Sequence, residues 1–294
     1  MIAKMLHSTL GAASALALVA TCVAQSAPGV KFPQASPPAS LKQQVGVTDF
    51  EVTYSRPSMK GREIFGGLVP YGEVWRTGAN NAPKITFNNA VKFEGTEIPA
   101  GTYELFTIPN KDEWTIIIHQ NKSQWGTYSY DQANDVARVT VKPAATPRPT
   151  ETFAITFNDL TNNSATMNLY WENVRVPVKL TVDTVGTVVP QIEAALAGQA
   201  QPNAMLLFSA AMFYLENDLD LNKALEWMNA AIAARQPPQM WMVYRKGLVL
   251  AKMGDKAGAK AAAEESIALA EKAPSPALRD EYIRLNKALI ESVK

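Results

Sequence analysis

The chain has 294 residues and a nearly balanced charge, with 28 Lys and Arg residues against 27 Asp and Glu residues. Apolar residues make up 47% and charged residues 19%, which is typical of a folded chain with a sizeable core. The charge balance excludes a strongly basic protein of the kind that binds nucleic acid in bulk. One Cys and two His exclude disulfide scaffolds, multi-histidine metal sites and most redox chemistry. We expect no metal, no cofactor and no nucleic-acid partner.

Residues 1–24 have the pattern of a signal peptide. Lys4 precedes an apolar run at residues 10–20, which at about 1.5 Å per residue spans roughly half of a ~30 Å hydrocarbon core. Small residues at Cys22 and Ala24 predict cleavage after Ala24, which would leave His119 as the single histidine. The alternative is a lipid anchor at Cys22. We therefore expect an exported protein, periplasmic or extracellular, without a membrane span.

A β-sandwich is predicted for residues 45–185, after a proline-rich flexible leader at residues 25–44. Apolar and polar residues alternate there, with many β-branched and aromatic residues. Strands are expected at residues 50–54, 84–87, 102–106, 114–118, 136–141, 152–157, 165–171 and 174–182. The strand at residues 114–118 is apolar on both faces and is expected in the centre of a sheet. Short strands separated by turn residues, with no helix between them, favour an antiparallel sandwich or jelly-roll-like barrel.

Residues 186–294 predict an α-helical repeat domain, so that the whole chain is an α+β multidomain protein. Apolar residues recur at three and four positions in segments 204–215, 223–234, 241–253, 256–270 and 277–293. Residues 220–224 resemble residues 255–259 at an offset of 35, a spacing typical of tetratricopeptide helix pairs. The alternative is an unrelated alanine-rich bundle. Helical repeats of this kind could bind a protein or peptide partner.

Residues that could bind a ligand are concentrated between positions 55 and 82. The predicted ligand-binding residues are Arg56, Arg62, Tyr71, Trp75, Arg76 and Asn80. Arginine offers a planar fork for a carboxylate or phosphate, aromatic rings offer a stacking face, and glycines let the backbone approach a ligand closely. This pattern predicts a loop-built site for a small anionic or sugar-like ligand. The alternative is an ordered loop whose arginines bind internal carbonyls and whose tryptophan fills the sandwich.

Several motifs occur together in and after this segment: Ser-Arg-Pro, Lys-Gly-Arg, Val-Pro-Tyr-Gly, Val-Trp-Arg-Thr-Gly-Ala-Asn, Ile-Pro-Ala-Gly-Thr-Tyr-Glu-Leu-Phe and Glu-Trp-Thr-Ile-Ile. Through them the chain resembles a bacterial family known as domain of unknown function 2911, over about residues 46–183. The resemblance implies an exported β domain, which some members extend with helical repeats. It implies no catalytic residue, because the family has no established activity.

His119 is a weak candidate for a catalytic base. A lone histidine at the end of a strand is more often a surface or hydrogen-bonded residue, but it could act with a carboxylate if Glu73 or Asp131 lay near it. Aromatic residues at 125–130 could line a sugar or peptide groove, although filling of the β core is the commoner role of such residues. Three further carboxylates are expected on a sheet surface, those of Glu94, Glu97 and Glu104.

These observations favour a non-catalytic binding or assembly protein of the bacterial cell envelope. A purely structural envelope scaffold is one alternative. Another is a hydrolase or isomerase whose pocket contains Arg56, Arg76, Asn80 and His119. The enzyme alternative requires His119 and the loop at residues 74–81 to share one cleft, within about 8 Å, because catalysis needs hydrogen-bond reach to a common substrate.

Overall fold

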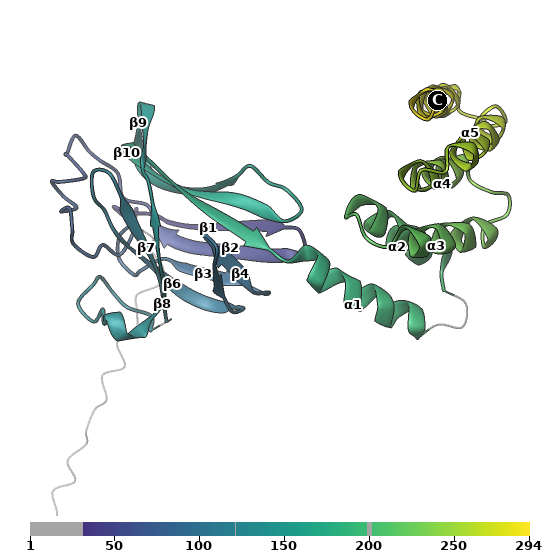
Figure 1. Cartoon of the computed structure of the whole chain (residues 1–294). Coiled ribbons are helices and arrows are strands. Elements are labelled where there is room, and N and C mark those ends of the chain that lie inside the picture. Colours follow the sequence, from purple (N-terminus) through teal and green to yellow (C-terminus); the bar gives the residue numbers. More distant parts are fainter. Residues whose placement is uncertain (1–31, 121, 199–201) are drawn as a thin grey trace, which may run out of the picture.

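The computed structural model describes residues 32–120, 122–198 and 202–294, which form an antiparallel β domain followed by helices (Figure 1). One sheet has six strands in the order β1-β2-β3-β6-β7-β8, and the other has four in the order β5-β4-β10-β9. The six strands are β1 (Pro38–Val45), β2 (Thr48–Ser55), β3 (Lys84–Phe87), β6 (Gly101–Ile108), β7 (Trp114–Gln120) and β8 (Asp135–Val141). The four are β4 (Val91–Phe93), β5 (Thr96–Ile98), β9 (Ala144–Asn158) and β10 (Ser164–Val182).

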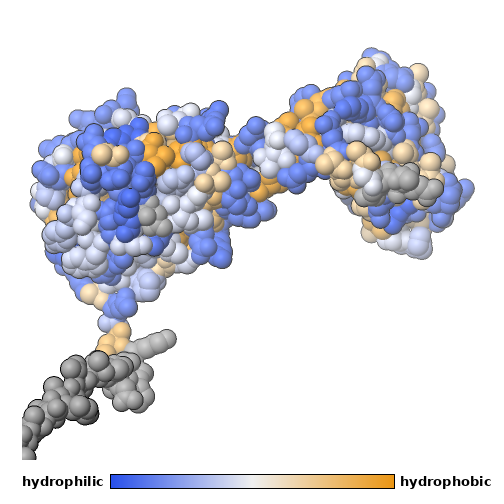
Figure 2. Space-filling model, turned by 90° about the horizontal axis from the view of Figure 1, so that it is seen from below, coloured by the Kyte–Doolittle hydropathy of each residue, from blue (hydrophilic) through white to orange (hydrophobic). Residues whose placement is uncertain are grey.

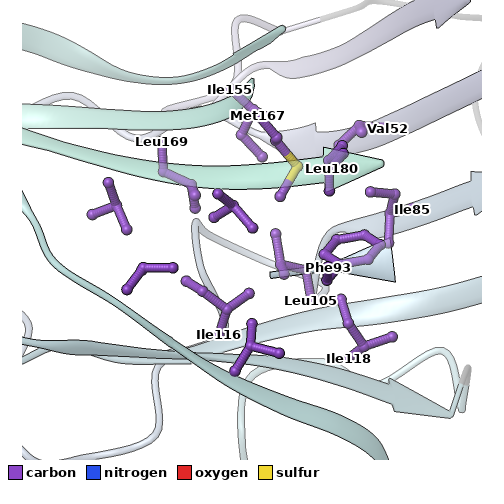
Figure 3. Close-up of a cluster of buried hydrophobic side chains, with 14 of the residues drawn as sticks. Val52, Ile85, Phe93, Leu105, Ile116, Ile118, Ile155, Met167, Leu169 and Leu180 are labelled. Carbon is purple, nitrogen blue, oxygen red and sulfur yellow. The ribbon is translucent and has the colours of Figure 1, made fainter. Parts of the chain in front are cut away.

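The hydrophobic core of the β domain lies between the two sheets (Figure 3). Successive side chains of a strand point to opposite faces, so the alternating apolar residues of each strand gather on its inner face. The six-stranded sheet contributes Val52, Ile85, Leu105, Ile116 and Ile118, and the four-stranded sheet contributes Phe93, Met167, Leu169 and Leu180. These side chains are at most 2% exposed, which explains why two sheets without disulfides can hold together.

The strands differ from the sequence prediction at several places, among them β9, which begins at Ala144 and not at residue 152. Residues 38–45 form β1, paired with β2 along its whole length, although the sequence predicts a flexible leader up to residue 44. The short strands β4 and β5 are not predicted. Glu172, expected in a turn, lies inside the continuous strand β10, where the pairing with β9 shifts register on both sides of it. Its positive φ of 54° fits a β-bulge, which bends a strand without ending it.

Strand β7 is buried on both faces but is second from the edge of its sheet, not central. Its inner residues join the sandwich core, whereas Ile117 packs on the outer face with Phe106 and Ala82. The segment at residues 122–134 covers this outer face, and its Tyr130 ring lies 5.2 Å from that of Phe106. A loop rather than a further sheet therefore buries the outer side of β6 and β7.

Six α-helices follow the sheets within the described part of the chain (Figure 1). They are α1 (Thr184–Ala197), α2 (Ala204–Glu216), α3 (Leu221–Ala233), α4 (Met240–Lys252), α5 (Lys256–Ala270) and α6 (Pro276–Ser292). Helix α1, which the sequence does not predict, begins directly after β10 and is capped by the Asp183 carboxylate, which accepts from the Gly186 N–H. Its β-branched residues and Pro190 weaken the helical signal. Its Ile192 packs with Tyr214 in the helical core.

The 35-residue offset corresponds to equivalent positions in two helix pairs. Asp220 caps the N-terminus of α3, and Asp255 caps that of α5. The pairs α2–α3 and α4–α5 are packed neighbours. Small residues stand at the matching close approaches: Ala224 and Ala259, then Ala231 and Ser266, all fully buried. This equivalence supports an internal repeat, and its assignment as tetratricopeptide-like stays a prediction.

The surface in Figure 2 is largely hydrophilic, with apolar residues in small areas. None of the helices in the described ranges has the length and apolarity that a membrane crossing requires. The most exposed large apolar side chains of these ranges are Tyr128, Phe32 and Trp125, at 85%, 80% and 62%. Two of the three belong to the loop that covers β7, which makes this loop a candidate for binding.

Replacing Leu105 by Ala tests the importance of the inter-sheet core. The side chain is fully buried between the sheets, so we expect the free energy of unfolding of the β domain to fall by about 2–5 kcal/mol. The matched control is Val136→Ala on β8, where 38% of the residue is exposed and a change within about 0.5 kcal/mol is expected. Urea denaturation measures both, and equal midpoints for the two variants would contradict this account of the core.

Candidate ligand-binding site

A hollow of about 410 Å³ lies beside the long loop between β2 and β3. We call it the basic pocket, because Lys60, Arg62 and Arg76 line it together with the indoles of Trp75 and Trp171. The other lining residues are Ala35, Ser36, Pro57, Ser58, Leu68, Val69, Gly78 and Ala79. No Asp or Glu is among the described residues that line it, so its three cations face no carboxylate within the pocket.

Trp75 fixes the loop to the β domain. Its backbone pairs with Thr107 of β6 through two hydrogen bonds, of 2.7 Å from the Trp75 N–H and 2.9 Å from the Thr107 N–H. Its ring stacks on that of Trp171 from the other sheet, with centroids 5.7 Å apart. Gly78 follows at a φ of 145°, where a Cβ would lie 3.0 Å from the Ser55 carbonyl oxygen, so glycine is required for this close approach.

The three arginines differ in what they bind. The Nε of Arg56 donates to the Phe153 carbonyl at 2.8 Å, and Arg56 does not line the basic pocket. Arg62 lines it, but donates to the carbonyls of Met59 and Ser58 at 2.8 and 2.6 Å. The Nε of Arg76 is buried and has no hydrogen-bond partner among the described residues. Arg76 is therefore the one of the three whose guanidinium forms no hydrogen bond with the described residues.

Tyr71 and Asn80 lie outside the basic pocket. Tyr71 lines a separate hollow with Phe65, and burial raises its pKa, as do the carboxylates of Glu172 and Glu63. Lys111 lines the same hollow, with its Nζ 6.0 Å from the centre of the Tyr71 ring. The Asn80 side chain donates to the Ser55 hydroxyl at 3.2 Å, which is a structural contact. Of the six predicted residues, the structure thus brings Arg62, Trp75 and Arg76 together at one hollow.

Two side chains of the basic pocket, Lys60 and Trp171, are not among the predicted ligand-binding residues. Lys60 belongs to the Lys-Gly-Arg motif, but nothing in the sequence distinguishes it from any other exposed lysine. Trp171 comes from β10, far along the chain from Trp75, and no local pattern predicts that the two indoles stack. Only the packing of the two sheets against each other brings them together.

His119 lies in a buried polar cluster and not in a cleft. It stands opposite Glu104 in the β6–β7 register, with Nδ1 3.8 Å from Glu104 Oε2, and both residues are fully buried. The ring nitrogens lie 2.7 Å from the Gln120 carbonyl and 3.2 Å from the Asp131 carbonyl. Glu104 is therefore not on a sheet surface as expected, and Asp131 approaches His119 through its backbone. A histidine without solvent access cannot contact a substrate.

Glu104 holds the loop that covers β7. Its Oε1 accepts from the Gln124 backbone N–H at 2.7 Å, and its Oε2 accepts from the Gln124 side-chain amide at 3.0 Å. A buried carboxylate is costly unless it is hydrogen-bonded in this way. The cluster of Glu104, His119 and Gln124 thus has a structural role, which is to anchor the start of the loop at residues 122–134.

The aromatic residues of this loop do not fill the core as expected. Trp125 and Tyr128 are 62% and 85% exposed, and their rings stack on each other with centroids 5.8 Å apart and planes 12° apart. We call them the aromatic pair. The loop is tied to the basic-pocket loop, because the Gly126 N–H donates to the Asn80 carbonyl at 3.1 Å and Asn81 forms a β-bridge with Trp125. Tyr130 alone packs inward.

No group of three or more His, Cys, Asp and Glu side chains within residues 32–120, 122–198 and 202–294 is placed to hold a metal ion. The chemistry that the site offers is therefore that of its cations, indoles and hydroxyls. The cations can bind an anion, and the indoles can pack against a flat apolar face.

Replacing Glu104 by Ala tests its role as the anchor of the loop. The change leaves the buried Gln124 N–H without an acceptor, so we expect the free energy of unfolding to fall by about 1–3 kcal/mol and proteolysis within residues 122–130 to become faster. Glu97→Ala is the control, because the Glu97 side chain is 68% exposed and forms only a surface ion pair with Lys92. A Glu104 variant as stable and as resistant as the control would rule out the anchoring role.

One comparison with known proteins gave a match, and it lies in the β domain. A family model described as a protein of unknown function, DUF2911, matches residues 36–180. The match extends from just before β1 nearly to the end of β10, and so includes the aromatic pair and every lining residue of the basic pocket except Ala35. Searches of the curated proteins and of the solved structures gave no significant match.

Proposed function

The chain belongs through its β domain to the DUF2911 family, and we propose that it is an exported, non-catalytic binding or assembly protein of the bacterial cell envelope. In this proposal the β domain binds a small anionic or sugar-like ligand in the basic pocket, and the helices bind a protein or peptide. The observation that carries it is the convergence of Lys60, Arg62 and Arg76 on one hollow whose described lining contains no carboxylate.

Arg76 is expected to contribute most to anion binding. Lys60 and Arg62 are exposed, so water and salt screen their charges. Arg76 is half-buried, and a charge–charge attraction at 4 Å is worth about 4 kcal/mol at the effective dielectric constant of a partly buried site, against about 1 kcal/mol in water. Its planar guanidinium can also donate two parallel hydrogen bonds to a carboxylate, phosphate or sulfate.

The pocket lining supports binding rather than catalysis. Its polar groups are cations and the hydroxyls of Ser36 and Ser58, and the Ser58 hydroxyl already lies 2.9 Å from that of Thr152. No imidazole or carboxylate lines the pocket among the described residues to accept a proton from a substrate. Of the four residues in the enzyme alternative, only Arg76 lines it, so this geometry gives the alternative no support.

The helical partner is supported by a row of half-buried aromatic rings. Phe208 of α2 packs edge-on against Trp241 of α4 at 4.7 Å, and Tyr244 of α4 packs against Tyr282 of α6 at 6.0 Å. The guanidinium of Arg245 lies 5.4 Å from the Tyr244 ring centre. Helix α4 contacts both α2 and α6 and carries one ring of each pair, so the row runs from α2 across α4 to α6. Aromatic and arginine side chains are the residue types that dominate binding energy at protein interfaces.

Export rests on the sequence pattern of residues 1–24, which lie outside the described residues, as do Cys22 and Ala24. Cleavage after Ala24 would release the protein, and lipid attachment at Cys22 would hold it at a membrane surface. Both outcomes place the β domain and the helices outside the cytoplasm.

Replacing Arg76 by Gln tests the basic pocket. We expect binding of citrate or inorganic phosphate to weaken by about tenfold or more, because a charge-assisted hydrogen bond contributes about 1.5–3 kcal/mol and each 1.4 kcal/mol is tenfold in affinity. The melting temperature without ligand should not fall, since the buried Nε of Arg76 has no hydrogen bond to lose. Calorimetric titration at low salt measures the affinity, and thermal unfolding measures the stability.

Arg148→Gln on β9 is the matched control, because this arginine is exposed and does not line the basic pocket. A purely structural scaffold predicts the opposite pattern, in which Arg76→Gln lowers the melting temperature and no anion binds the unchanged protein. That pattern would rule out the binding function.

Replacing Arg245 by Glu tests the helical face. Peptides selected from a random library on the full chain should be apolar with acidic residues, to match the aromatic row and Arg245, and should lose about tenfold in affinity when the charge is reversed. Lys287→Glu, at an exposed position of α6, should change their affinity less than twofold. Fluorescence polarisation measures both, and equal losses would place the peptide elsewhere.

A further inference from the structure

Arg76 connects the basic pocket to the aromatic pair. It lines the pocket, and its Nη1 lies 4.0 Å from where a Cβ would stand on Gly126, a residue between Trp125 and Tyr128. The two loops are joined at the same place by the hydrogen bond from the Gly126 N–H to the Asn80 carbonyl. The pocket and the aromatic pair are therefore adjacent parts of one surface that share a guanidinium.

Folding does not account for the position of the aromatic pair. Single exposed apolar residues are common on protein surfaces, but Trp125 and Tyr128 stand together, nearly parallel, and are 62% and 85% exposed. Two stacked rings cover only one face of each, so an outer ring face is left open to a ligand. Stacking of this kind gives a flat apolar platform of fixed orientation.

The platform is held in place before any ligand binds. Glu104 anchors Gln124, the residue before Trp125, through two hydrogen bonds of 2.7 and 3.0 Å. The β-bridge between Asn81 and Trp125 fixes the next residue. A surface that is already ordered loses less conformational entropy on binding, which favours affinity for a rigid ring.

The combination of groups indicates the class of ligand. A sugar ring has an apolar face of C–H groups that can pack on an aromatic ring, and an acidic sugar adds a carboxylate or sulfate that an arginine can bind. The platform lies outside the pocket, so a ligand that reaches both must be longer than one small anion. Single-stranded nucleic acid also stacks on aromatic rings, but it needs cations along its whole backbone, and the chain has almost no excess of positive charge, with 28 Lys and Arg residues against 27 Asp and Glu residues.

We propose that the basic pocket and the aromatic pair form one extended site for an acidic oligosaccharide. The anionic group of one sugar lies against Arg76 in the pocket, and a neighbouring ring packs on Tyr128 and Trp125. This inference rests on the proposed function, because it uses the same pocket, and it adds the ligand class and a second contact surface.

The test is the affinity of the full chain and its Tyr128→Ala variant for four probes: oligomers of uronic acids, neutral oligosaccharides of the same length, inorganic phosphate, and oligothymidylate. We expect the variant to bind the best uronic-acid oligomer about tenfold more weakly, and phosphate within twofold of the unchanged protein. Tyr128→Phe should keep the affinity, because it keeps the ring. Tyr71→Ala is the matched control, an exposed tyrosine that does not line the basic pocket.

Three results would overturn the extended site: no uronic-acid oligomer binds more tightly than phosphate, Tyr128→Ala leaves the affinity for the oligomers unchanged, or oligothymidylate is the probe that depends on Tyr128. In each of these cases phosphate can still bind in an Arg76-dependent way, and the proposed function then stands. Absence of any anion binding to the unchanged protein overturns both.

Discussion

The stacking of Trp75 on Trp171 is the contact on which the candidate site depends. The loop between β2 and β3 contains several glycines and little regular structure, so it needs an anchor to hold one conformation. The two indoles supply it across the two sheets, at 5.7 Å, while the Trp75 backbone pairs with Thr107. Because Arg76 follows Trp75 directly, the same contact fixes the backbone that carries the guanidinium. The core of the sandwich and the wall of the basic pocket thus share the same two indoles.

The sequence predicts the fold well where an alternating pattern runs through a strand with a buried inner face, as in β2, β6 and β8. It fails where the pattern is short or weak. Strand β4 has only three residues, and β1 is an edge strand whose inner residues Ala39 and Leu41 are only half-buried. The sequence Glu172-Asn173 is typical of a turn, and it also fits a β-bulge because bulges and turns use the same backbone conformations. Pairing with β9 makes this segment a bulge and not a turn, and the local sequence does not show that pairing.

The candidate site was predictable by residue type but not by role. Arg56, Arg62 and Arg76 are chemically identical, and their difference arises from carbonyl groups that the fold brings to two of them. The carbonyl that Arg56 binds belongs to Phe153, 97 residues along the chain. The same holds for Glu104 and His119, since only the β6–β7 register reveals that they face each other in a buried cluster. Residue chemistry limits what a site can bind, and topology selects which residues form it.

The unpartnered Nε of Arg76 distinguishes this arginine from Arg56 and Arg62, whose Nε groups bind carbonyls. A buried donor without an acceptor costs about 1–3 kcal/mol, which is a large part of a typical domain stability of about 5–15 kcal/mol. Arg56, with its carbonyl partner, carries no such cost. An anion in the basic pocket would give the Arg76 guanidinium an acceptor that the described residues do not provide, so binding it breaks no internal hydrogen bond of this side chain.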